Sequence, residues 1–118
     1  MWKMFIDDER FPVKDDFIIV RSVAEAILEI EKHDQPPNYI SFDHDLGDNV
    51  KTGFDLAKWL VEKDLDYEGS FLPNDFSFYV HSANPVGKEN IEGLLNNYLE
   101  YRLNQLKQKK TKIKTISL

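Results

Sequence analysis

The chain has 118 residues, 42% of them hydrophobic and 31% charged, which is the size and composition of one globular domain. It contains no cysteine, so disulfide frameworks, thiolate zinc sites and cysteine nucleophiles are excluded. No apolar run approaches the ~20 residues that span a bilayer. An acidic cluster follows Ile6 directly, which is not the pattern of a signal peptide. We therefore expect a cytoplasmic protein that does not contact a membrane.

The formal net charge of −6 is unevenly distributed along the chain. Residues 1–100 hold all 21 acidic residues and 9 Lys and Arg, a charge of −12. Residues 101–118 hold six Lys and Arg and no acidic residue, a charge of +6. The acidic part is expected to repel nucleic acid unless metal ions or the basic segment intervene.

Four short runs rich in aromatic and β-branched residues predict β-strands. They lie at residues 4–6, 17–20, 39–42 and 76–80. Because the runs are apolar on both faces, we expect a central sheet that is covered on both sides. Only about nine residues, with Pro12 among them, separate the first two strands, which disfavours a crossover helix there.

Apolar residues at helical spacing predict three helices. The first begins after Ser22, which forms a Ser-x-x-Glu capping box with Glu25. The second contains residues 54–61, and the third contains residues 85–106. Residues 112–118 alternate with period two, which is typical of an edge strand with a charged outer face, unless this end of the chain frays.

Strands that alternate with helices predict an α/β fold, a single-domain doubly wound parallel sheet in which the first crossover helix is missing. Right-handed crossovers give the strand order 2-1-3-4, with a fifth strand if the C-terminal segment joins the sheet. The predicted domain covers residues 1–107, and residues 108–118 form a basic tail or edge strand.

Three of the predicted strands end in clusters of polar residues. These clusters are Asp7-Asp8-Glu9-Arg10, Asp43-His44-Asp45 and His81-Ser82-Ala83-Asn84. Sites in open parallel sheets form at the carboxyl ends of the strands, so the clusters should converge. Crowded carboxylates repel unless a cation neutralises them, and an oxygen-rich, thiol-free site suits Mg²⁺ or Mn²⁺. Each cluster alone also fits a solvated turn or helix cap, but their joint placement favours a metal-dependent or phosphate-handling site.

The order of these motifs resembles that of a response-regulator receiver domain. The run from Phe5 to Glu9 resembles its start, where an acidic pair binds Mg²⁺, and Asp43 matches its phosphoacceptor. Gly53-Phe54-Asp55-Leu56 resembles the opening of the next helix, and Ser82-Ala83 the end of the fourth strand. The chain departs from receivers in three ways. It has no room for the first helix, it lacks their Lys-Pro pair, and two histidines, His44 and His81, flank the expected site.

The strings from Asp7 to Arg10, from Asp43 to Gly47 and from His81 to Gly87 resemble a narrower group, the cyclic-phosphate processing receiver-like domains. This resemblance implies a divalent cation site and a role on cyclic phosphates such as RNA ends. The expected partner is therefore a small phosphate-containing molecule or an RNA end.

The implied reaction indicates roles for the residues of the site. A 2′,3′-cyclic phosphate opens by in-line attack of water, which needs a base and an acid. Imidazole serves as either near neutral pH, so His44 and His81 are catalytic candidates together with Asp43. Asp7, Asp8 and Asp43 are the candidate ligands of Mg²⁺ or Mn²⁺, which would neutralise the phosphate oxygens.

Phosphate contacts are expected from Arg10, Ser82, Asn84 and Lys88, and from backbone amides at the start of the last helix. The sequence thus favours a metal-dependent phosphoesterase acting on cyclic or terminal phosphates. The alternative is a non-catalytic receiver-like module that binds a phosphorylated ligand or partner, or accepts phosphate on Asp43. The two histidines and the missing Lys-Pro pair favour the enzyme.

Overall fold

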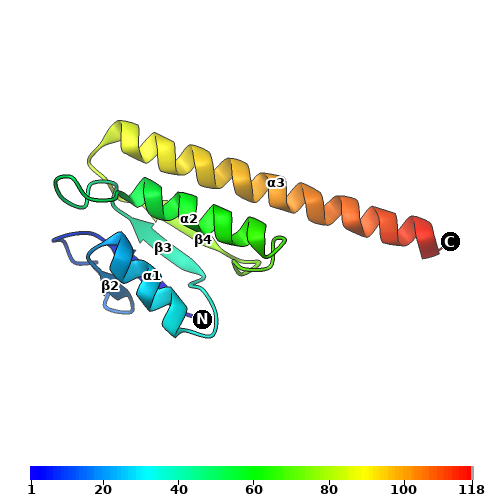
Figure 1. Cartoon of the computed structure of the whole chain (residues 1–118), viewed down its shortest axis with the longest axis horizontal. Coiled ribbons are helices and arrows are strands. Elements are labelled where there is room, and N and C mark those ends of the chain that lie inside the picture. Colours follow the sequence, from blue (N-terminus) through cyan, green and yellow to red (C-terminus); the bar gives the residue numbers. More distant parts are fainter. Residues whose placement is uncertain (118) are drawn as a thin grey trace.

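The computed structural model describes the backbone of residues 1–117 and the side chains of residues 1–109. Four strands form one parallel sheet in the order β2-β1-β3-β4, which confirms the predicted order. The described backbone between β1 and β2 contains no helix, also as predicted. The elements are β1 (Lys3–Ile6), β2 (Ile18–Val20), α1 (Val23–Lys32), β3 (Tyr39–Phe42), α2 (Gly53–Asp66), β4 (Ser77–Val80) and α3 (Pro85–Ser117) (Figure 1).

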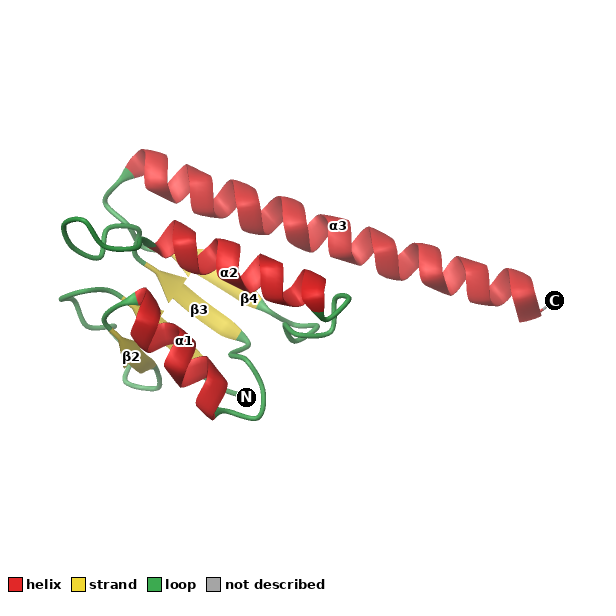
Figure 2. Ribbon diagram, viewed as in Figure 1, coloured by secondary structure: helices red, strands yellow, loops and turns green. Residues whose placement is uncertain are grey.

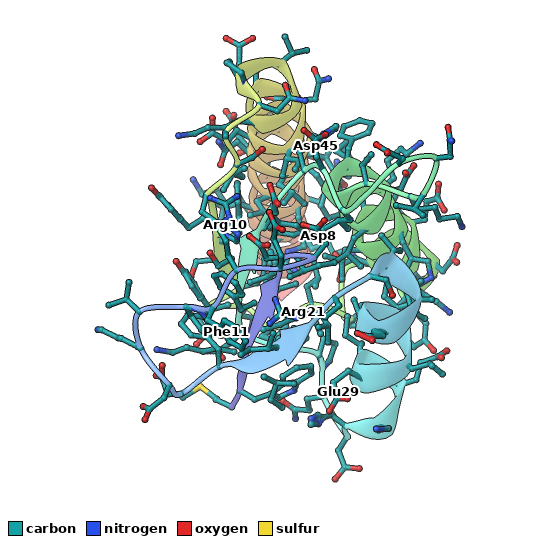
Figure 3. All side chains as sticks on the ribbon, turned by 90° about the vertical axis from the view of Figure 1, so that its left-hand side faces the viewer. Asp8, Arg10, Phe11, Arg21, Glu29 and Asp45 are labelled. Carbon is teal, nitrogen blue, oxygen red and sulfur yellow. The ribbon has the colours of Figure 1, made fainter. Side chains whose placement is uncertain are left out.

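The three helices lie on one face of the sheet (Figures 1 and 3). The crossovers through α1 and α2 run in the same direction, and right-handed connections then place both helices on one side. α3 packs against α2 and β4. The core between sheet and helices contains Met4, Ile6, Ile40 and Phe42, all fully buried. Helices therefore cover only one face of the sheet, and the expectation that both faces are covered is wrong in this respect. A helix between β1 and β2 would lie on the other face, but the chain has only a loop there.

Local sequence explains where the first two helices begin. The Ser22 hydroxyl accepts a hydrogen bond from the Glu25 backbone N–H at 3.1 Å, which confirms the predicted cap. At the start of α2, the Asp55 carboxylate accepts the Thr52 backbone N–H at 2.8 Å. This hydrogen bond is the main reason why the pKa of Asp55 lies below its ordinary value.

α3 is the longest element and extends well beyond the sheet (Figure 2). Its 33 residues span about 50 Å, and the molecule is 57 Å long. The predicted edge strand at residues 112–118 is wrong, because the backbone of residues 112–117 is helical; residue 118 lies outside the described residues. The chain has no glycine or proline after Gly93, so nothing ends the helix and each added residue propagates it. α3 also runs without a break across residue 107, where the predicted domain ends and the predicted tail or edge strand begins.

A buried polar cluster ties α3 to the end of the sheet where the strands begin. Asp64 of α2 is fully buried and accepts hydrogen bonds from the backbone N–H groups of Phe71 and Leu72 at 2.9 and 2.7 Å. From α3, Tyr98 donates its hydroxyl to Asp64, and the Arg102 guanidinium lies 3.4 Å from the same carboxylate. Burial, followed by the hydrogen bond to Asp64, raises the pKa of Tyr98. Sequence reasoning gave no role to this cluster.

Candidate metal and phosphate site

Three carboxylates meet at the carboxyl end of the sheet. Backbone hydrogen bonds continue the sheet past the last residues of β1 and β3, with Asp43 N–H donating to the Ile6 carbonyl at 2.9 Å. One oxygen each from Asp7, Asp8 and Asp43 lie within 4.8 Å of one another. Asp7 and Asp43 are buried, and Asp8 is exposed. The structure thus brings together the three residues that the sequence nominated as metal ligands, and an all-oxygen donor set fits Mg²⁺ or Mn²⁺.

Asp7 keeps its charge in spite of its burial. Burial raises the pKa of Asp7, but several interactions act against it and the net pKa lies below the ordinary value. The backbone N–H groups of Arg10 and Glu9 donate to its Oδ1 at 2.8 and 3.0 Å. His81 and the Arg10 guanidinium contribute in the same direction. The turn after β1 therefore holds a buried carboxylate in its ionised, ligand-competent form.

Arg10 lies between two of the clustered carboxylates. Its Nε donates to Asp7 Oδ2 at 2.9 Å, and its Nη2 lies 3.5 Å from Asp43 Oδ2. The guanidinium therefore pairs with both buried acids, although its single positive charge offsets only one of their two negative charges. Asp7 is the main reason why the pKa of Arg10 is raised. Half of the Arg10 side chain is exposed to solvent. Figure 3 shows Arg10 beside Asp8 at this end of the molecule.

His81 is held on both ring nitrogens and on one ring face. Its Nε2 is 3.0 Å from Asp7 Oδ2 and its Nδ1 is 2.7 Å from Ser41 Oγ. An ionised carboxylate only accepts hydrogen bonds, so Nε2 carries a proton. The imidazole stacks on Phe5 with the ring centroids 4.5 Å apart and the planes 1° from parallel. Ser41 was missed by sequence reasoning; its signal was a single hydroxyl inside an otherwise apolar strand.

His44 lies on the other side of β3, against the start of α3. Its Nδ1 is 2.8 Å from Asp45 Oδ1, and this hydrogen bond is the main reason why the pKa of Asp45 is lowered. Among the described residues, no hydrogen-bond partner is present at Nε2. A Cβ built on Gly87 would lie 2.3 Å from the His44 Cγ, so a glycine is required where α3 passes the ring. A Cβ at Gly53 would likewise lie 2.0 Å from the Asp43 carbonyl oxygen.

The residues expected to contact phosphate are not all in one place. An open cavity at the carboxylate cluster includes Arg10 and Ser82 in its lining. Asn84 instead caps α3, because its Oδ1 accepts the Gly87 N–H at 3.0 Å. Lys88 lies outside this lining, with its Nζ 5.9 Å from the centre of the Tyr79 ring. The full lining is Asp8, Glu9, Arg10, Asp43, Asp45, Gly47, Asp48, Ser82 and Ala83, and it includes neither His44 nor His81.

A family model described as the cyclic-phosphate processing receiver domain matches residues 2–97. The chain belongs to this family. The matched residues include all four strands, the three carboxylates and both site histidines, which confirms the family that the sequence motifs indicated. The chain matches neither a curated protein nor a solved structure. Within the described residues, no helix combines the length and the apolar character that crossing a membrane requires.

Proposed function

We propose that this cyclic-phosphate processing receiver domain is a metal-dependent phosphoesterase that opens cyclic phosphates, with RNA ends as the substrate class. The observation that carries the proposal is the cluster of Asp7, Asp8 and Asp43, whose oxygens lie within 4.8 Å of one another beside an open cavity. Arg10 offsets only one of the three negative charges, and the remaining like charges at this separation are costly without a further cation. Mg²⁺ or Mn²⁺ bound there would neutralise the non-bridging phosphate oxygens.

The chain supplies two phosphate contacts around this cluster. Arg10 pairs with Asp7 and Asp43. With a divalent cation held by Asp7, Asp8 and Asp43, the half-exposed guanidinium would be free to bind a phosphate oxygen. The Ser82 hydroxyl lines the same cavity and offers a second hydrogen bond. Asn84 acts less directly, as the cap of α3, and Lys88 lies outside the cavity lining, beside Tyr79.

The two histidines have different surroundings and therefore different roles. Asp45 holds the Nδ1 proton of His44, and this leaves Nε2 to exchange a proton. In the reaction, water attacks phosphorus, one of the two ring P–O bonds breaks, water gives a proton to a base, and the leaving ribose oxygen takes one from an acid. We assign one of these transfers to His44. His81 holds Asp7 in place through Nε2, and it moves a proton only if that contact opens.

Hydrolysis of a nucleoside 2′,3′-cyclic phosphate, measured with Mg²⁺, with Mn²⁺ and with a chelator, tests the proposal. We expect turnover with metal, and its loss in Asp8→Asn, which keeps the shape of the side chain but removes a ligand charge. Asp75→Asn, an exposed carboxylate at the opposite end of the sheet, is the matched control. Equal turnover in the chelator and in Mg²⁺ would contradict a metal-dependent reaction.

A second candidate is a non-catalytic module that binds a phosphorylated ligand or accepts phosphate on Asp43. It is favoured by one observation: neither imidazole lines the cavity at the carboxylates. In this case Asp43 takes up phosphate from acetyl phosphate in Mg²⁺, and the wild type does not hydrolyse any cyclic phosphodiester. The phosphorylated chain is detected by its added mass, and Asp43→Asn is the control.

A further inference from the structure

The face of the sheet opposite the helices carries a row of side chains that leads to the site. In the strand register, Phe5 pairs with Ile19 and Ser41, and Ser41 pairs with Tyr79. Paired residues of parallel strands point to the same face, so these four side chains form one row. We call this the open face, because no helix of the described chain lies on it (Figure 3). Asp7, Asp43 and His81 follow two residues farther along the same strands.

The rings on the open face differ in their access to solvent. Phe5 is buried at 7% exposure, because Phe17 and His81 pack against it. Phe17 in turn packs against Tyr39, with ring centroids 6.0 Å apart. These rings form a thin layer that supports the strands. Tyr79 is different: 55% of it is exposed.

Tyr79 also lies beside a positive charge. Lys88 Nζ is 5.9 Å from its ring centre, a cation–π arrangement that leaves more than half of the residue exposed. An exposed ring offers a surface on which a nucleobase can stack, and the ammonium beside it favours a ligand that carries negative charge. The ring does not match a second copy of the chain or an apolar peptide, because one ring offers too little apolar area for either.

Tyr79 lies on the same face of the sheet as the carboxylate cluster, toward the start of β4. Tyr79 and His81 lie on the same face of the same strand end, about 7 Å apart at the rise of a β-strand. His81 contacts Asp7 directly. β4 is the neighbour of β3, so Tyr79 also lies one strand from Asp43 and two residues farther back along the sheet. A nucleoside with its phosphate at the carboxylate cluster would have its base within reach of Tyr79.

We propose that Tyr79 is a base-stacking platform, and that the nucleoside which carries the cyclic phosphate rests its base on this ring. The inference deepens the proposed function, because it names a nucleoside phosphate at an RNA end as the ligand. Aromatic rings bind bases of any sequence, since every base has a π-face. The site is then selective for nucleosides over other cyclic phosphates, but not for one base.

Equilibrium binding tests this platform without the need for turnover. Two probes are titrated by calorimetry in Mg²⁺: adenosine 3′-monophosphate and ribose 3-phosphate, which lacks the base. We expect Tyr79→Ala to weaken binding of the nucleotide about tenfold, the effect typical of one stacked base. Binding of ribose 3-phosphate should not change, and Tyr79→Phe should bind the nucleotide like the wild type.

Tyr67→Ala is the matched control, because Tyr67 is 54% exposed and lies at the other end of the sheet, after α2. The platform is refuted if Tyr79→Ala binds both probes like the wild type, if it weakens both equally, or if the wild type does not bind the nucleotide. Failure of the proposed function looks different: nucleotide binding then still depends on Tyr79, but no cyclic phosphate is hydrolysed.

Discussion

Substitution of Gly87 by alanine should act on the protein through the ring of His44. A Cβ at this position would lie 2.3, 2.6 and 2.7 Å from Cγ, Cδ2 and Nδ1 of that ring. Ordinary contacts between carbon atoms are about 3.5–4.0 Å, so the overlap exceeds an ångström. The ring must turn away, and its hydrogen bond to Asp45 is lost with it.

The expected magnitude combines two opposing effects. Alanine is about 1 kcal/mol more favourable than glycine inside a helix. Overpacking of a filled position costs about 1–3 kcal/mol. Gly87→Ala should therefore leave the free energy of unfolding unchanged or lower it by up to about 2 kcal/mol. In a His44→Ala background the obstacle is absent, and the same substitution should raise that free energy by about 1 kcal/mol.

Urea unfolding of the four proteins in this double-mutant cycle measures the effect, and the coupling between the two sites should be about 1–3 kcal/mol. Gly93→Ala is the control, because it lies in the same helix and a Cβ there meets nothing within 4 Å. It should stabilise the protein in both backgrounds. If Gly87→Ala stabilises the wild type as much as Gly93→Ala does, the His44 ring is not packed against α3 and the reasoning is refuted.

Four further predictions concern the clusters described above. Asp64→Ala should lower the free energy of unfolding by about 3–5 kcal/mol in urea unfolding, because it leaves a buried arginine and two backbone N–H groups without their partner. Mg²⁺ at ten times its dissociation constant should raise that free energy by about 1.4 kcal/mol through mass action, and Asp8→Asn should abolish the effect. Asp55→Asn should destabilise α2 by about 1 kcal/mol near pH 7. Since the folded state lowers the pKa of Asp55, this contribution is present above about pH 4, the ordinary range of an aspartate, and is lost as the pH falls through the folded-state value. His44→Ala should reduce turnover of a cyclic phosphodiester by about 10²–10⁴-fold with little change in the metal-dependent stability. His81→Ala should reduce both turnover and the metal-dependent stability, because His81 holds Asp7 in place.

Each of these predictions has an outcome that contradicts it. Asp66→Ala, an exposed neighbour on α2, should cost far less than Asp64→Ala, and equal losses would argue against a buried network. A Mg²⁺ effect of the same size in Asp8→Asn would place the ion elsewhere. If the free energies of unfolding of the wild type and of Asp55→Asn differ by the same amount from pH 7 to pH 2, the Asp55 carboxylate does not stabilise the helix cap. Full activity in both His44→Ala and His81→Ala would show that neither imidazole takes part in the reaction.

Short-range patterns predicted most of the fold. Aromatic and β-branched runs located all four strands, and the Ser22 cap located the start of α1. Two expectations were wrong because the same pattern fits two environments. Alternation at residues 112–118 resembled a strand, yet the segment continues a helix that has no breaker. Apolar residues on both strand faces suggested a sheet that is covered on both sides, but on the open face only a few packed rings bury Phe5, without a helix of the described chain.

The site was predictable where it depends on strand ends and unpredictable where it depends on side-chain direction. Topology alone brings Asp7 and Asp43 together, because they follow neighbouring parallel strands. The position of Lys88 beside Tyr79 depends on how α3 passes the sheet, which residue spacing does not encode. The same holds for Arg10, whose contact with both acids arises from the conformation of one turn.

The length of α3 separates the charges of the molecule along its long axis. α3 starts near the carboxyl ends of the strands, where the carboxylate cluster lies, and runs to the other end of a molecule 57 Å long (Figure 1). All six basic residues after position 100 belong to the sequence of its C-terminal half. The chain therefore has a large electric dipole moment. The field of a nearby polyanion exerts a torque on this dipole and turns the C-terminal end of α3 toward the polyanion. At 0.1 M salt the screening length is about 10 Å, much shorter than the molecule. At this salt concentration each end of the molecule interacts only with charges close to it. A distant polyanion can therefore orient the molecule only at low ionic strength.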